Sequence, residues 1–99
     1  ILDALAQEMH TVASLARTVR AELDAAGGAV RAGTRKRTEK SLAHFDEVLA
    51  RWRGLSDRPS GASITNLRSA ATSLNSQLMS AQSRIANEIA LSHHGDSND

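Results

Sequence analysis

The sequence of 99 residues has no cysteine and no tyrosine, and it has one tryptophan, one phenylalanine and one proline. Without cysteine, disulfide bonds and thiolate chemistry are excluded. Aromatic residues make up 2% of the chain, which argues against a β-sandwich or barrel, because strands favour aromatic and β-branched side chains. The chain also lacks a large excess of positive or of negative charge, since 12 basic and 11 acidic residues leave a net charge of +1. No global charge draws the chain toward nucleic acid or a membrane surface, and no apolar run is long enough to span a bilayer.

Apolar residues recur in three stretches with the spacing of amphipathic helices. In the first stretch the intervals alternate between three and four residues, the heptad spacing of helices that pack side by side. Gly27 and Gly28 follow, and glycine readily adopts the left-handed conformation that ends many helices. We therefore predict a first helix over residues 2–26. The first repeat consists of Leu2, Leu5, Met9, Val12, Ala16, Val19, Leu23 and Ala26.

Two further repeats follow. The second is out of phase with the first and predicts a helix over about residues 34–53, after a loop or weakened helix at 27–33. Residues 54–62 contain glycine and proline and form the predicted linker to a third helix over about 63–92, with Gly95 as its stop. The second repeat consists of Leu42, Phe45, Leu49 and Trp52, and the third of Ile64, Leu67, Ala71, Leu74, Leu78, Ala81, Ile85 and Ile89.

These repeats predict an all-α fold. Each helix has only a narrow apolar stripe, so it is not stable alone in water and must pack against other helices. We predict a single domain over residues 1–95 and a disordered tail at 96–99. Two architectures are open, an antiparallel three-helix bundle and a helical hairpin with a broken first arm. Alanines make the predicted core thin, so we also expect a protein partner, in a homo- or hetero-oligomer formed by helix packing.

Positive charge is concentrated at the start of the predicted second helix, where five of the 12 basic residues fall within ten positions. Phosphate groups and anionic lipid headgroups bind patches of this kind, whereas no interleaved aromatic residue supports stacking on nucleic-acid bases. The alternative is a solvated helix start or a patch complementary to the acidic first segment. We expect Arg35, Lys36 and Arg37 to be dispensable for folding. The basic patch consists of Arg31, Arg35, Lys36, Arg37 and Lys40.

The outer face of the predicted third helix is polar but nearly uncharged. Between Pro59 and Asn87 the only charged residues are Arg68 and Arg84. A solvated helix face normally carries Lys and Glu pairs, whereas small side chains let another helix come close and hydroxyls form hydrogen bonds across the contact. We predict that this face contacts another protein chain, and the alternative is a solvated serine-rich surface. The serine face consists of Ser69, Ser73, Ser76, Ser80 and Ser83.

No constellation of residues points to catalysis. The four histidines are isolated or adjacent in the tail, whereas a zinc site needs three or four converging ligands. No serine lies in a Gly-x-Ser-x-Gly elbow, and no glycine-rich phosphate loop precedes a Lys-Ser/Thr pair. We expect no enzymatic activity, no cofactor and no metal site. His10 leaves one alternative open, the phosphoacceptor of a helical phosphotransfer domain.

A Trp-x-Gly motif, Trp52-Arg53-Gly54, lies between the second and third repeats. A cysteine-free helical chain of about a hundred residues with this motif at its centre resembles the WXG100 (ESAT-6-like) family. The resemblance implies a bacterial helical hairpin exported by type VII secretion as a homo- or heterodimer, with Trp52 and Gly54 as the turn motif between long helices. The sequence has no tyrosine for the C-terminal Tyr-x-x-x-Asp/Glu signal of that family.

The function that we expect is a non-catalytic helical module for protein–protein interaction or assembly, acting through heptad-type helix packing. One alternative is a secreted WXG100-like hairpin. Another is a helical module that binds phosphate or anionic lipid through the basic patch at residues 31–40. We expect a soluble protein without a transmembrane segment, and the sequence is compatible with both the cytoplasm and secretion.

Overall fold

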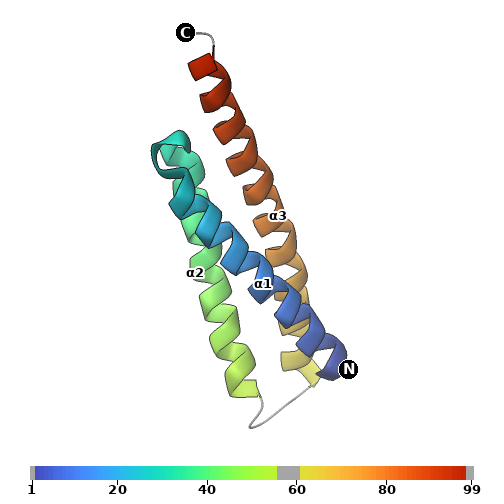
Figure 1. Ribbon diagram of the computed structural model, residues 1–99. Helices are drawn as coiled ribbons and strands as arrows, with labels where there is room; N and C mark the ends of the chain where they lie inside the picture. Colours follow the sequence, from blue (N-terminus) through green and yellow to red (C-terminus); the bar gives the residue numbers. More distant parts are fainter. Residues whose placement is uncertain (1, 56–60, 98–99) are drawn as a thin grey trace.

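The computed structural model describes residues 2–55 and 61–97, and over these residues the fold is all-α, as predicted. Three α-helices are joined in an up-down-up arrangement (Figure 1), with a short 3-10 turn between the first two. The elements are α1 (Leu2–Ala26), the 3-10 turn η1 (Gly27–Ala29), α2 (Ala32–Leu55) and α3 (Gly61–Ser97).

The molecule is a rod of 59 × 19 × 16 Å in which α3 is the central element. Both α1 and α2 pack along α3 more extensively than they pack against each other. They run antiparallel to one another, so the chain forms a three-helix bundle rather than a hairpin with an interrupted arm. The C-terminal end of α3 projects beyond the turn that joins α1 to α2 (Figure 1).

The helix boundaries follow the glycines only in part. Helix α1 has the predicted bounds, and α2 and α3 each begin two residues before the predicted start. Helix α3 also continues through the predicted stop at Gly95 to Ser97, and so includes two residues assigned to the tail. Of the predicted linker, residues 56–60 lie outside the described residues, as do 98–99 of the tail.

Gly27 ends α1 because its backbone has a φ of +51°, in the left-handed region that favours glycine. We expect Gly27→Ala to lower the free energy of unfolding by about 1–2 kcal/mol, because a Cβ is strained at this φ. Gly28→Ala is the matched control, since Gly28 has an ordinary φ and open space around the added Cβ. Urea denaturation of both variants measures the difference, and equal stabilities would contradict this role for Gly27.

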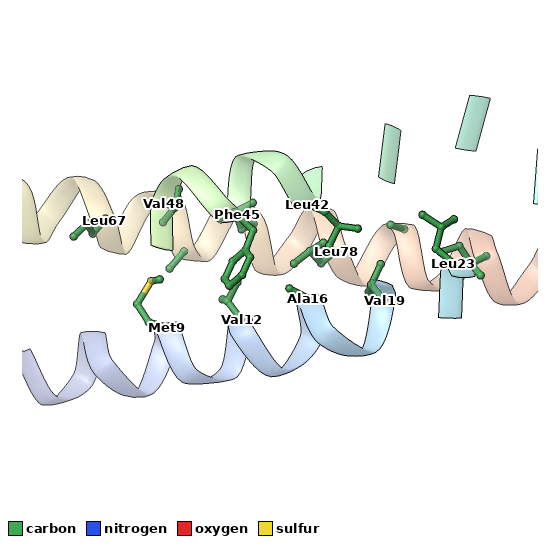
Figure 2. Close-up of a cluster of buried hydrophobic side chains, with 14 of the residues drawn as sticks. Met9, Val12, Ala16, Val19, Leu23, Leu42, Phe45, Val48, Leu67 and Leu78 are labelled. Carbon is green, nitrogen blue, oxygen red and sulfur yellow. The ribbon is translucent and has the colours of Figure 1, made fainter. Parts of the chain in front are cut away.

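The core lies where the three apolar repeats meet. Residues of all three helices interdigitate there, and in Figure 2 the Phe45 ring points from α2 toward Val12 of α1. In α2, Val48 is buried in place of Leu49 and Trp52, which lie at the edge of the core. The buried apolar residues are Leu5, Met9, Val12, Ala16, Val19, Leu23, Val30, Leu42, Phe45, Val48, Leu55, Leu67, Ala71, Leu74, Leu78, Ala81 and Ile85.

The first turns of α2 bury threonines instead of apolar side chains. Thr34 and Thr38 are 7% and 1% exposed, and both have their hydroxyls bonded. Thr38 Oγ1 donates to the carbonyl of Thr34 at 2.8 Å, and Thr34 Oγ1 donates to a carboxylate of α3. Because their hydroxyls are satisfied, these residues extend the packed face of α2 to its N-terminus without leaving an orphaned polar group.

Candidate interaction surface

The serine face is exposed along the whole middle of α3. All five serines that define it point away from the core. Ser73 Oγ accepts a hydrogen bond from Gln77 Nε2 at 3.2 Å. The hydroxyls of Ser69, Ser76, Ser80 and Ser83 have no hydrogen-bond partner within residues 2–55 and 61–97.

Two large apolar side chains of α3 are exposed. Met79 is 54% exposed and Leu91 is 55% exposed, and no other large apolar residue is as exposed in the described part of the chain. Leu91 follows Ile89, the last residue of α3 with a described side chain that packs against the core. Neither residue belongs to the heptad repeat, so the apolar pattern of the sequence does not reveal them.

Two charged residues of α3 contact its neighbours. Arg68 Nη2 lies 3.5 Å from Glu8 Oε1 of α1, and Glu88 contacts the start of α2. Gln82 Nε2 donates to Glu22 Oε1 of α1 at 2.8 Å, so this side chain also points toward α1 and not toward the serine face. The serine face itself is therefore small, polar and uncharged, and Met79 lies at its edge.

Glu88 caps the N-terminus of α2 from across the bundle. Its Oε1 accepts the backbone N–H of Arg31 at 2.7 Å, and its Oε2 accepts the Thr34 hydroxyl. A carboxylate is favourable there because the first N–H groups of a helix lack intrahelical partners and carry the positive end of the helix dipole. The Thr34 hydroxyl and the Arg31 N–H lower the pKa of Glu88 below its ordinary value, because both bond the charged form.

This lowered pKa makes the stability of the bundle depend on pH. The ionised Glu88 carboxylate stabilises the folded state above its unfolded pKa of 4.5, and that contribution is lost as the pH falls through the lower folded pKa. We expect the Tm to fall between about pH 6 and about pH 3 more steeply in the unmodified chain than in Glu88→Gln. Asp24→Asn, at an exposed carboxylate, is the control. Parallel Tm profiles for the chain and Glu88→Gln would contradict the cap.

Arg35 binds the C-terminus of α1 rather than solvent. Its Nη2 donates to the carbonyl of Gly27 at 2.6 Å and to that of Leu23 at 3.3 Å. A cation bonded to the last carbonyls of a helix interacts favourably with the negative end of its dipole. This contact gives a reason to expect that Arg35, unlike Lys36 and Arg37, contributes to the stability of the α1–α2 turn.

The other four cations of the basic patch are exposed but spread around α2. Lys36 and Lys40 are one helical turn apart and share one side. Arg37 instead lines the groove between α2 and α3, together with Arg84. Arg31 lies at the Ncap of α2, where Glu88 accepts its backbone N–H. The structure thus brings together Arg37 and Arg84, a pair that the sequence analysis did not connect.

Among the side chains that the structure describes, the remaining candidates do not converge on a chemical site. His10 is exposed and His44 is half-buried, while the side chains of His93 and His94 lie outside the described residues. Within the described part no three His, Cys, Asp or Glu side chains converge to hold a metal ion. The described helices also include none long and apolar enough to cross a membrane.

The Trp-x-Gly motif lies in the last turn of α2. Trp52 is half-buried against the core, and Gly54 is exposed one residue before the helix ends at Leu55. The motif therefore precedes the connection to α3. The first two helices are separate and antiparallel, whereas a helical hairpin has one long helix before this connection.

The fold places the chain in a broad class, the antiparallel three-helix bundles, and its outer α3 face gives it a candidate interaction surface. No family model, curated protein or solved structure matches the chain. Its function is therefore inferred from the geometry and chemistry of its own residues.

Proposed function

We propose that the chain is a non-catalytic assembly module in which the outer face of α3 pairs with the same face of a second copy. The observation that supports this is the exposed, uncharged middle of α3, where four serine hydroxyls have no partner in the described chain and Met79 is 54% exposed. Small side chains there let another helix approach closely, and the packed methionines supply apolar contact at the edge.

A second copy fits this face better than a charged partner does. A charged partner helix has to bury its charges against a surface without counter-charges, which is costly. Hydroxyls both donate and accept hydrogen bonds, so a serine-rich face is complementary to itself. A pair of identical faces also closes with twofold symmetry, the commonest arrangement of homo-oligomers.

An antiparallel pair uses the length of α3 best. With the twofold axis near Leu78, the two copies of Met79 meet at one edge of the contact, and Ser76 of one copy lies opposite Ser80 of the other. The C-terminal part of α3 with Leu91 then lies along the start of the partner's α3. A contact made by one helix from each copy is small, so we expect weak, concentration-dependent association.

The test combines a like-charge substitution with a charge-swap rescue. We expect Ser76→Lys alone to abolish association at concentrations where the unmodified chain is paired, because two lysines then enter an interface without counter-charges. Ala43→Lys, which adds the same charge on the exposed side of α2, should leave association unchanged. Sedimentation velocity measures association, and circular dichroism verifies that each variant keeps its helix content.

Mixing the Ser76→Lys and Ser80→Glu chains should restore a pair, because each lysine then faces a glutamate in the antiparallel arrangement. Rescue by the mixture supports both the face and its orientation. Association that survives Ser76→Lys, or that Ala43→Lys disrupts equally, would overturn the proposal.

A further inference from the structure

A groove between α2 and α3 brings two arginines from different helices into one hollow of about 200 Å³. Arg37 comes from α2 and Arg84 from α3, and the rest of the lining is small and polar with one alanine. The other lining residues are Thr34, Thr38, Ser41, Gln77, Ser80 and Ala81.

The two arginines have no acidic partner in this groove. No carboxylate lines it, and neither guanidinium forms a salt bridge with any residue in 2–55 or 61–97. The neighbouring carboxylate, Glu88, already accepts the Arg31 backbone N–H and the Thr34 hydroxyl. Glu88 is also attracted to Arg31 and Arg84, so these two arginines, Arg37 and the one carboxylate together leave two positive charges beside the groove (3 − 1 = +2).

The polar lining of the groove is ordered by its own hydrogen bonds. Ser41 Oγ donates to Gln77 Oε1 at 3.3 Å, and Gln77 Nε2 donates to Ser73 Oγ at 3.2 Å. The Thr38 hydroxyl is bonded to the backbone. The donors that remain free for a ligand are therefore the two guanidinium groups and the Ser80 hydroxyl.

We propose that this groove binds a phosphoryl dianion, the chemical group of inorganic phosphate and phosphate monoesters. Two guanidinium forks match the charge of a dianion and the geometry of its oxygens, and Ser80 supplies a further donor. A carboxylate carries one charge and two oxygens and uses these donors less completely. The site is formed within one copy of the chain, and it shares Ser80 with the proposed pairing face of α3.

The experiment titrates inorganic phosphate into the isotope-labelled chain and follows backbone amide signals by NMR. We expect saturable shifts centred on Thr38, Ser41 and Ser80. Arg37→Gln and Arg84→Gln should each weaken binding by about tenfold, because each removes one charge-assisted clamp. Lys36→Gln, at an exposed cation outside the groove, should weaken binding by less than about twofold. Helix content by circular dichroism verifies that the variants fold.

A second arm of the experiment separates a soluble phosphate from a lipid headgroup. Vesicles of phosphatidylcholine with phosphatidic acid are compared with vesicles of phosphatidylcholine alone, for the unmodified chain and for Arg37→Gln. Binding of free phosphate that depends on Arg37 and Arg84 assigns a soluble ligand. Binding to phosphatidic acid vesicles alone, with the same dependence on Arg37, assigns a headgroup. Absence of both at a concentration where the chain is monomeric, or equal weakening by Lys36→Gln, would overturn the proposal.

Discussion

Replacing Leu78 by alanine is expected to cost about 2–5 kcal/mol of the free energy of unfolding. Leu78 is fully buried at the middle of α3, where the side chains of all three helices meet. Truncation therefore removes apolar contacts on two sides and leaves a cavity that long, straight helices relax only partially to fill. A loss of this size is a large part of the stability of a small domain.

The matched control for Leu78 is its neighbour in the sequence. Met79 is 54% exposed, so Met79→Ala should change the free energy of unfolding by less than about 0.5 kcal/mol. Urea denaturation at a concentration where the chain is monomeric gives both values. Similar losses for the two variants would mean that α3 is rotated relative to the core described here.

Replacing Arg35 by glutamine is expected to cost about 1–2 kcal/mol, because the carbonyls of Leu23 and Gly27 lose a charged donor at the end of α1. The effect is largest at low salt, where the attraction between the guanidinium and the helix end is least screened. Urea denaturation at two salt concentrations measures it.

Lys36→Gln is the control for Arg35, since it removes the same charge from the next, exposed position of α2. It should be neutral to within about 0.5 kcal/mol. Replacing Arg35, Lys36 and Arg37 together would therefore mix the loss of the contact at the α1–α2 turn with the loss of surface charge on α2, so the single variants are compared instead. If Arg35→Gln is as stable as Lys36→Gln, the contact does not hold the turn.

The heptad repeats were sufficient to predict the fold class and most of the core. In α1 and α3 the buried residues belong to the predicted apolar repeats, because apolar side chains at intervals of three or four residues all lie on one face of a helix. In α2 the stripe was misplaced at its end, where Val48 and not Leu49 or Trp52 is fully covered. Helix α2 packs against both α1 and α3, so the directions of these two neighbours decide which of its side chains are buried. The spacing of apolar residues in the sequence does not give these directions.

The contacts that hold the turn were not predictable from spacing. Glu88 and Thr34 are 54 positions apart, and Arg35 bonds carbonyls up to 12 positions earlier, so both contacts form only after the helices pack. Buried threonines are also invisible to an apolar pattern, although both have their hydroxyls bonded. The pair Arg37 and Arg84 was missed for the same reason, since sequence analysis grouped Arg37 with its neighbours on α2.

The proposal that α3 pairs with a second copy is tested most directly by the mass of the unmodified chain in solution. Sedimentation equilibrium from about 10 µM to about 1 mM covers the range of weak, specific association. If α3 pairs, the mass rises with concentration from the 10.6 kDa of one chain toward twice that value, and no further, because paired α3 faces leave no free copy of the surface. A mass of one chain at every concentration would contradict the proposal.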